Sequence, residues 1–354
     1  MKKIFMKGND AIAEAAVMCG CRHFFGYPIT PQNEIPEYMS WRLPEVGGVF
    51  VQAESEVAAI NMVYGAAGAG ARAMTSSSSP GISLKLEGIS YIAGTDLPCV
   101  IVNIMRAGPG LGSIQPSQSD YFQAVKGGGH GDYHCLVYAP SSVQEAVDMV
   151  QLAFDKADEY RIPVIILGDG LIGQMMEPVT IEKKIPIATD KSWATTGWRD
   201  KSRPRAVINS LSLDPDELER FNIRRQEKYR LIREREARFS TINAEDCDIL
   251  AVAYGSVARI MRSVVADHQD DGPKIGLFCP QTLWPFPYKE LAALAQGKKA
   301  VFCAEMSAGQ MLEDVKLAVL NAAPVRFYGR MGGVVPTAEE LYEEILKIGE
   351  AFLL

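Results

Sequence analysis

The chain has 354 residues, of which 47% are hydrophobic and 22% are charged, and its formal net charge is −7. The length exceeds the roughly 250–300 residues at which a single core stops growing, so two domains are expected, and the ordinary composition excludes general disorder. The negative charge gives no reason to expect a nucleic-acid partner, and no run approaches the roughly 20 apolar residues of a membrane span. Charged residues also interrupt the N-terminal segment where a signal peptide would lie, so we predict a cytoplasmic enzyme.

The first half of the chain alternates between helical and strand patterns. Apolar residues from Asp10 to Gly20 have helical spacing, a short strand follows at 23–25, and a strand at 47–52 leads into a small-residue helix after Glu54. The further expected elements are a strand at 71–79, a helix at 81–94, strands at 97–106 and 134–140, a helix capped by Ser142 and Glu145 that runs to Tyr160, and a strand at 162–170. This alternation predicts a parallel sheet with helices on both faces.

The α/β pattern is lost between Glu177 and Glu245 and then returns. A polar, irregular segment is followed by a highly charged helix within 214–238. Such a helix usually presents a solvated face, and docking against another subunit is the alternative. A second α/β pattern begins at Cys247 and has expected strands at 247–256, 274–287, 299–311 and 325–333, a helix from Val257 to Ala266, and a last helix from Thr337. We therefore predict a larger α/β domain (1–178), a linker with the charged helix (179–245) and a smaller α/β domain (246–354).

The seven cysteines do not indicate a metal or disulfide framework. Their number is odd and no Cys-x-x-Cys pair occurs. Several lie in apolar runs such as LPCVIVNIM (97–105), where buried free thiols are usual. The segment HGDYHC (130–135) has two histidines four residues apart, but the glycines before it favour a loop over a metal-binding helix.

Three unusual segments each follow an expected strand of the first domain. They are FFGYPITPQNE (24–34), TSSSSPG (75–81) and NIMRAGPG (103–110). Ligands of parallel sheets bind at the carboxyl ends of the strands, so these segments predict one ligand site. Prolines on both sides of Thr30 restrict the first segment, which is either a tight surface turn or a loop held ready for a ligand.

Common nucleotide and nucleophile motifs are incomplete in this chain. GPGLG (108–112) lacks the full G-x-G-x-x-G pattern, and no P-loop occurs. The serine run (76–79) lacks the G-x-S-x-G elbow, so hydrogen bonding to a polar ligand is favoured over a serine nucleophile. Glu54 and Glu56 stand at the start of a helix, where the helix dipole favours negative charge. Either glutamate could instead occupy a low-dielectric site with a raised pKa, and the pattern leaves both interpretations open.

The segments GYPITP (26–31), AESEVAAINMVYGAAGAGARAMTSSSSPG (53–81) and VNIMRAGP (102–109) together resemble the thiamine-pyrophosphate-dependent 2-oxoacid:ferredoxin oxidoreductases. The resemblance covers nearly the entire chain and is to the alpha-type subunit, which carries the pyrimidine-binding domain. The branched-chain (2-oxoisovalerate, or 3-methyl-2-oxobutanoate) type is most similar, and the 2-oxoglutarate type is next. The resemblance implies a thiamine-diphosphate-binding fold followed by a smaller, transketolase C-terminal-like α/β domain.

Specific residues acquire roles from this resemblance. Glu56, and not Glu54, is the implied catalytic glutamate that contacts the cofactor's aminopyrimidine. Thr30 and Arg106 are implied as catalytic residues that bind the substrate carboxylate. The planar fork of an arginine is better suited to hold a carboxylate than a lysine is. The other implied cofactor contacts are Tyr27, Pro28 through its carbonyl, and Ser78.

The implied reaction is the coenzyme A-dependent oxidative decarboxylation of a 2-oxoacid, with reduction of ferredoxin. Thiamine pyrophosphate would be shared with a beta-type subunit that binds the diphosphate and Mg²⁺, while gamma and ferredoxin-like subunits complete the complex and iron–sulfur clusters lie on partner subunits. LGDGLIGQMME (167–177) begins like a Mg-diphosphate motif but lacks its Asn, so we interpret it as a strand-end turn and expect no metal on this chain. The alternatives are a non-catalytic scaffold subunit and a decarboxylase or transketolase-like enzyme that needs no ferredoxin.

Overall fold

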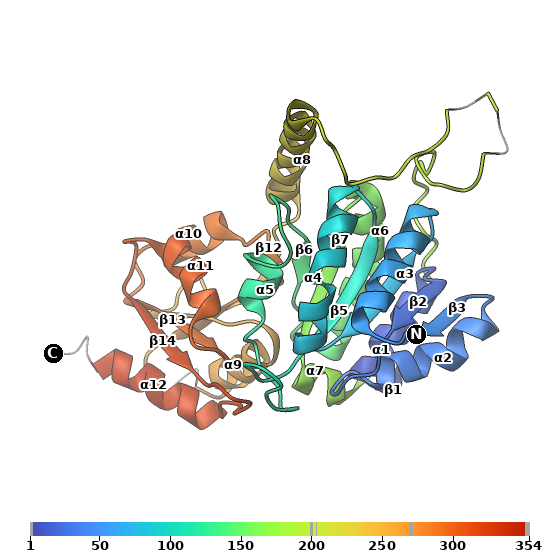
Figure 1. The fold of residues 1–354 in the computed structure, drawn as a ribbon. Helices are drawn as coiled ribbons and strands as arrows, with labels where there is room; N and C mark the ends of the chain where they lie inside the picture. Colours follow the sequence, from blue (N-terminus) through green and yellow to red (C-terminus); the bar gives the residue numbers. More distant parts are fainter. Residues whose placement is uncertain (1–2, 199–200, 203, 269–271, 351–354) are drawn as a thin grey trace.

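The computed structural model describes residues 3–198, 201–202, 204–268 and 272–350. Two α/β domains lie side by side, and each is built on a mainly parallel sheet (Figure 1). The strands of the first sheet are β2 (His23–Gly26), β3 (Val49–Gln52), β4 (Ala73–Ser77), β5 (Cys99–Met105), β6 (Leu136–Tyr138), β7 (Pro163–Asp169) and β12 (Thr282–Trp284), in the spatial order β12-β6-β7-β5-β4-β2-β3.

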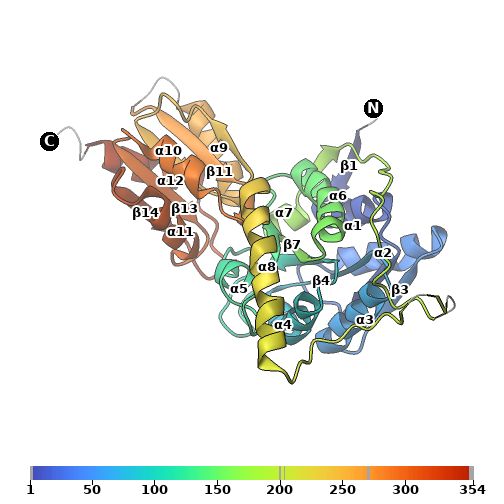
Figure 2. The same cartoon turned by 90° about the horizontal axis from the view of Figure 1, so that it is seen from above.

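Helices cover both faces of this first sheet, as the alternation of patterns predicts. They are α1 (Gly8–Met18), α2 (Glu34–Glu45), α3 (Glu56–Gly68), α4 (Ser79–Gly94), α5 (Tyr121–Val125), α6 (Val143–Tyr160) and α7 (Gly170–Gln174). Helices α1 and α6 pack together on one face, and α3 and α4 pack together on the other (Figure 2). Strands β5 and β7 are buried along their whole length, which explains why both are continuous apolar runs.

The second domain has a five-stranded sheet in the order β14-β13-β10-β11-β9. Its elements are β9 (Phe239–Ile242), β10 (Ile249–Val252), β11 (Ile275–Pro280), β13 (Ala300–Glu305), β14 (Val325–Gly329), α9 (Gly255–Asp267), α10 (Tyr288–Ala295), α11 (Gln310–Val319) and α12 (Ala338–Glu350). Helix α9 packs on α12, and α10 packs on α11. Strand β9 belongs to this second sheet although it lies before residue 246, where the sequence predicts that the second domain begins. The domain boundaries 1–178, 179–245 and 246–354 stay a prediction.

The expected single strand at 274–287 is wrong. The chain forms β11 in the second sheet and then crosses to form β12, which pairs antiparallel with β6 of the first sheet. Both pieces are buried and only Gln281 separates them, so the sequence reads as one continuous strand. Helix α2, which contains Pro36 and Pro44, and the antiparallel pair β1 (Ile4–Lys7) and β8 (Met176–Val179) also went unpredicted.

The charged helix α8 (Pro215–Arg235) is exposed over most of its surface, as its composition predicts. Its buried residues are Arg225, Tyr229 and Ile232. Arg225 donates to the Gly94 carbonyl at 3.0 Å, so the helix is anchored at the end of α4.

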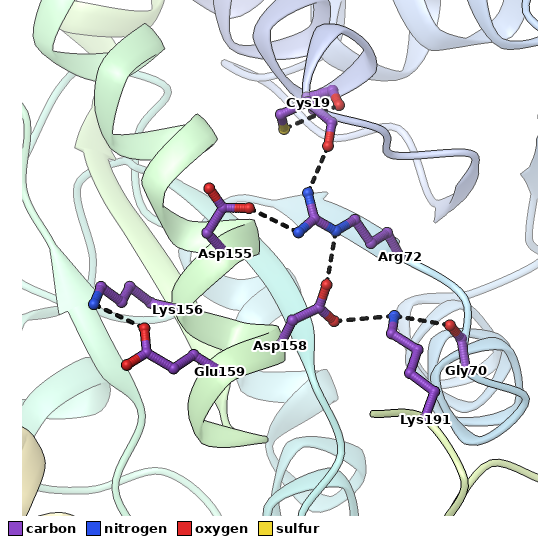
Figure 3. Close-up of polar contacts among 9 residues, drawn as sticks. Cys19, Gly70, Arg72, Asp155, Lys156, Asp158, Glu159 and Lys191 are labelled. Carbon is purple, nitrogen blue, oxygen red and sulfur yellow. Dashed lines mark hydrogen bonds and ion pairs between the residues drawn. The ribbon is translucent and has the colours of Figure 1, made fainter. Parts of the chain in front are cut away.

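A cluster of ion pairs around Arg72 joins several elements at the amino-terminal edge of the first sheet. Arg72, just before β4, contacts Asp155 at 2.7 Å and Asp158 at 2.8 Å, and it donates to the Cys19 carbonyl at 2.6 Å (Figure 3). Lys191, from the irregular segment after β8, contacts Asp158 at 3.1 Å. These bonds join α1, β4, α6 and the irregular segment, so the cluster has a structural role.

All seven cysteines are free and buried, as predicted, and burial raises the pKa of every one of these thiols. The segment 130–135 is irregular, as expected. Within the described residues, no set of three or more His, Cys, Asp or Glu side chains is placed to hold a metal ion. No helix in the same part of the chain combines the length and apolar character needed to cross a membrane.

Candidate active site

The implied site residues lie at the carboxyl ends of four adjacent strands. Thr30 is in the loop after β2, Glu56 follows β3, Ser78 follows β4, and Arg106 follows β5. Because the sheet order is β5-β4-β2-β3, these strand ends form one continuous edge. The structure therefore brings the three unusual segments of the sequence to one place, where parallel sheets bind ligands.

The two glutamates before α3 have different surroundings. Glu54 is exposed, whereas Glu56 is the first helical residue and is only 6% exposed. The Oγ of Ser55 caps the helix by accepting from the Ala58 backbone N–H at 3.2 Å. Within the described part of the chain, the Glu56 carboxylate has no hydrogen-bond partner. A buried acceptor at the positive end of a helix, left free by the protein, is suited to a ligand.

Gly81 makes room for this carboxylate. A Cβ added at Gly81 would lie 2.7 Å from Glu56 Oε1 and 2.1 Å from Ser77 Oγ. Both distances are too short for any side chain, so the first turn of α4 can approach Glu56 this closely only with glycine at this position. Glu56, Ser77 and Gly81 thus form one compact group.

The serine run divides into two functional parts. The Oγ atoms of Ser77 and Ser78 are buried and have no hydrogen-bond partner. Ser79, in contrast, donates to Asp120 at 2.6 Å and accepts from the Arg106 backbone N–H at 3.0 Å. Buried hydroxyls without partners cost free energy, so Ser77 and Ser78 are available to a ligand and Ser79 holds the framework.

Arg106 and Thr30 come together, but not through the threonine hydroxyl. Arg106 is 7% exposed, and it donates from Nη1 to the Thr30 carbonyl and from Nη2 to the Leu111 carbonyl, both at 3.0 Å. The Thr30 hydroxyl instead accepts from Asn33 at 3.3 Å. The Nε of Arg106 is buried without a partner, so this N–H is free to bind a ligand.

The loop after β2 is held from within. Tyr27 and Pro28 are exposed at its rim. Gln32 is fully buried and donates to the Tyr27 carbonyl at 3.4 Å, while Asn9 donates to the Pro31 carbonyl at 2.8 Å. The loop is therefore organised by buried amides as well as by its prolines.

Several residues at this edge have no clear sequence signal. Asp120 accepts from Ser79 and, at 2.9 Å, from Asn103, and burial raises its pKa. It lines a cavity of about 650 Å³ between the domains, to which Met306 and Gln310 also contribute. Asp120 sits in a polar loop in which nothing distinguishes it from its neighbours, so the sequence alone could not single it out.

The Gly-Asp-Gly turn is structural, as interpreted from the sequence. Asp169 accepts from the backbone N–H groups of Leu171 and Ile172, both at 3.1 Å, and so caps α7. It also accepts from the Ser256 N–H of the second domain at 3.0 Å. Its carboxylate is used to join the two domains.

Comparison with known proteins shows the family of the chain. Residues 14–241 match the family described as pyruvate flavodoxin/ferredoxin oxidoreductase, thiamine diphosphate-binding, and residues 247–341 match pyruvate:ferredoxin oxidoreductase core domain II. The ketoisovalerate oxidoreductase subunit VorB of Methanothermobacter marburgensis is 50% identical over 344 residues, which are 97% of each chain. The 2-oxoglutarate synthase subunit KorA of Methanothermobacter thermautotrophicus is 36% identical and covers 98% of this chain and 99% of its own.

Solved structures show the same architecture. The 2-oxoglutarate:ferredoxin oxidoreductase from Magnetococcus marinus, solved with 2-oxoglutarate, coenzyme A and succinyl-CoA bound, matches with a TM-score of 0.87 at 26% identity. The match covers 98% of this chain and 65% of that one, so this chain spans about two thirds of the neighbour's length. A split-gene transketolase matches with a TM-score of 0.58 at 13% identity and shares the fold alone. The chain belongs to the thiamine diphosphate-binding family of pyruvate flavodoxin/ferredoxin oxidoreductases.

Proposed function

We propose that this chain is the pyrimidine-binding subunit of a 2-oxoacid:ferredoxin oxidoreductase with 2-oxoisovalerate as its substrate. The complex would convert the 2-oxoacid and coenzyme A to acyl-CoA and CO₂, and the two electrons released would reduce two ferredoxins. The observation that carries the proposal is Glu56, a buried carboxylate without a partner at the ligand-binding edge of the sheet. The 50% identity to a ketoisovalerate oxidoreductase subunit supports the choice of substrate.

The residues present fit the pyrimidine half of thiamine diphosphate. Glu56 would hold the hydrogen bond to the ring nitrogen N1′, and Ser78 offers a buried hydroxyl that no protein group uses. Tyr27 and the Pro28 carbonyl lie at the rim of the same edge. When bound, the cofactor supplies the carbon nucleophile and the electron sink for decarboxylation.

Arg106 and Thr30 would orient the 2-oxoacid. The free Nε–H of Arg106 and its positive charge favour the substrate carboxylate, and the Thr30 hydroxyl lies on the loop that Arg106 already holds. Because Gln32 and the prolines fix this loop, little conformational freedom is lost when the substrate binds.

Partner subunits would complete the enzyme. The relatives are named as subunits, which supports a heteromeric assembly. We assign the cofactor diphosphate and Mg²⁺ to a beta-type subunit, and the iron–sulfur clusters to partner subunits in a complex that also contains gamma and ferredoxin-like subunits. The assembly would be cytoplasmic.

A second candidate substrate is 2-oxoglutarate. A relative named 2-oxoglutarate synthase subunit is 36% identical, and the structural neighbour was solved with 2-oxoglutarate bound. The reaction and the roles of Glu56, Arg106 and Thr30 would be the same for both substrates.

An activity panel on the co-purified complex tests the proposal. 2-Oxoisovalerate, 2-oxoglutarate and pyruvate are supplied with coenzyme A and either ferredoxin or a dye acceptor. We expect the highest kcat/KM with 2-oxoisovalerate, dependence on coenzyme A, and weak thiamine diphosphate binding by the isolated chain. Turnover without coenzyme A, or tight cofactor binding by this chain alone, would overturn the proposal.

A further inference from the structure

Lys85 is a fully buried lysine without a counterion in contact. It lies in α4, and its exposed fraction is 0%. Its Nζ donates to Thr75 Oγ1 at 2.7 Å and to the Ser76 carbonyl at 3.0 Å. No carboxylate of the described residues lies within 4.0 Å of this nitrogen. Lysines are almost never fully buried unless paired, so this position requires an explanation.

Lys85 begins a chain of hydrogen bonds that leads to the loop after β2. The pairing between β2 and β4 covers only the first two residues of each strand, so side chains connect their carboxyl ends. Ser76 Oγ donates to the buried Gln32 side chain, which in turn donates to the Tyr27 carbonyl at 3.4 Å. The lysine thus connects α4, through β4, to the loop that carries Thr30.

Lys85 is also electrostatically coupled to Glu56. Burial lowers the pKa of Lys85 to about 7, and the negative charge of Glu56 opposes this shift. Glu56 is the one ionisable group of the described residues whose charge acts on Lys85. The other groups that face the ammonium are the uncharged Thr75 and Ser76 of β4. The Lys85 ammonium and the Glu56 carboxylate therefore attract each other through the protein interior.

A partly buried lysine shows what a purely structural role looks like. Lys228 of α8 forms an ion pair with Asp96 and donates to the Arg161 carbonyl at 3.2 Å. Its side chain is 21% exposed, and it anchors α8 far from the sheet edge that carries Glu56. Lys85 has no ion pair of this kind and is coupled instead to the one carboxylate of the site that lacks a hydrogen-bond partner.

We propose that Lys85 is a positioning residue of the thiamine site, which holds the loop of residues 27–33 against β4 and acts on Glu56 through its positive charge. The inference rests on the proposed function, because Glu56 is the group through which Lys85 would act. The two roles can be separated: the hydrogen bonds hold the loop, and the charge acts on Glu56.

Variants of the assembled complex test these roles. We would measure the thiamine diphosphate Kd by fluorescence titration, with turnover and melting temperature as further readouts. The variants are Lys85→Met, which removes charge and donors, Lys85→Gln, which keeps donors without charge, and Lys228→Met as the matched control.

The expected results separate the two roles. Lys85→Met weakens cofactor binding about tenfold and lowers turnover, because it removes both the donors that hold the loop and the charge that acts on Glu56. Lys85→Gln keeps the affinity within about threefold, because its donors still hold the loop, but lowers turnover as Lys85→Met does, because the charge is absent. Lys228→Met lowers only the melting temperature.

The outcomes that would overturn the inference differ from those that would overturn the function. Wild-type turnover in Lys85→Gln, or Lys85 variants that behave like Lys228→Met, would refute the role of Lys85. If Lys85→Met does not assemble, Lys85→Gln alone decides. If instead Glu56→Gln leaves cofactor binding and turnover unchanged, the proposed function fails, whatever the Lys85 variants do.

Discussion

Each domain buries one glutamate at the carboxyl end of a parallel strand, and the two glutamates differ in their partners. Glu56, after β3, is 6% exposed and has no hydrogen-bond partner among the described residues. Glu305, the last residue of β13, is 1% exposed and accepts from Ser307 Oγ at 2.7 Å. It also accepts from the backbone N–H groups of Met311 and Leu312, both at 3.1 Å, and so caps α11.

The difference teaches that burial alone does not identify a site. What distinguishes the first sheet edge is hydrogen-bonding capacity left unused, at Ser77 Oγ, Ser78 Oγ and Arg106 Nε. Of the described residues from 239 onward, none has a buried side-chain nitrogen or oxygen without a partner. We therefore expect substitutions at the first edge to change chemistry and substitutions at the second to change stability.

The largest expected effect is that of Glu56→Gln. Loss of a general acid–base group typically costs 10²–10⁴-fold in rate, so turnover of the complex should fall by about that factor. Because Glu56 makes no hydrogen bond to the protein, subunit assembly and melting temperature should not change. Steady-state kinetics and size-exclusion chromatography on the same preparation measure both. Near-normal turnover would remove Glu56 from the mechanism and favour a scaffold role for the chain.

Gly81→Ala should affect the same group without changing its chemistry. The new Cβ would lie 2.1 Å from Ser77 Oγ and 2.7 Å from Glu56 Oε1, so the carboxylate must move. A small misplacement of a catalytic group can cost about 10²-fold in turnover, and we expect a loss of that order. Gly65→Ala in α3 is the control, because no atom lies within 4 Å of its added Cβ and alanine favours a helix by about 0.5–1 kcal/mol. Equal activity of the two variants would contradict the close packing around Glu56.

Arg106→Ala should weaken use of the 2-oxoacid. A hydrogen bond to a charged group contributes about 1.5–3 kcal/mol, so KM for the 2-oxoacid should rise about 10–100-fold, with a smaller change in KM for coenzyme A. Arg106→Lys should restore little, because a lysine cannot donate to the Thr30 and Leu111 carbonyls and also offer a planar fork. An unchanged dependence on the 2-oxoacid would exclude Arg106 from substrate binding.

The sequence predicted the location of the candidate site because its signals are local. Pro, Gly and Ser clusters after apolar strands mark strand ends, and the rule for parallel sheets places such ends together. The segments around Thr30, Ser78 and Arg106 met in this way. The preference for Glu56 over Glu54 came from the family resemblance and agrees with their burial, since only Glu56 is buried.

The sequence could not supply contacts between elements distant along the chain. The free space at Gly81 depends on how α4 approaches α3, and the crossing from β11 to β12 depends on how the two domains pack. Lys85 did leave a trace, since it occupies a place on the buried stripe of Ile82, Ile89 and Ile92 where an apolar residue is expected. A charged residue on an otherwise apolar helix face was the signal that could have identified it.

Glu305→Gln makes in the second domain the same change as Glu56→Gln in the first, and its expected effect is the smallest. Burial raises the pKa of Glu305 above its ordinary value of 4.5, although hydrogen bonds from Ser307 and the start of α11 oppose the shift. As pH rises above 4.5, this glutamate therefore ionises in the unfolded chain before it does so in the folded protein. The free energy of unfolding falls as pH rises through the raised pKa of the folded protein. The glutamine lacks this dependence, and its amide N–H₂ faces backbone donors, which costs about 1–3 kcal/mol.

This prediction is tested by the melting temperatures of the wild-type and Glu305→Gln complexes across pH 4.5–7, together with turnover per folded complex. We expect a lower melting temperature, a flatter pH profile and unchanged turnover for the variant, because Glu305 touches only its own domain. Lost turnover at an unchanged melting temperature would place chemistry in the second domain. In that case, unused hydrogen-bonding capacity would no longer distinguish a catalytic carboxylate in this fold from a structural one.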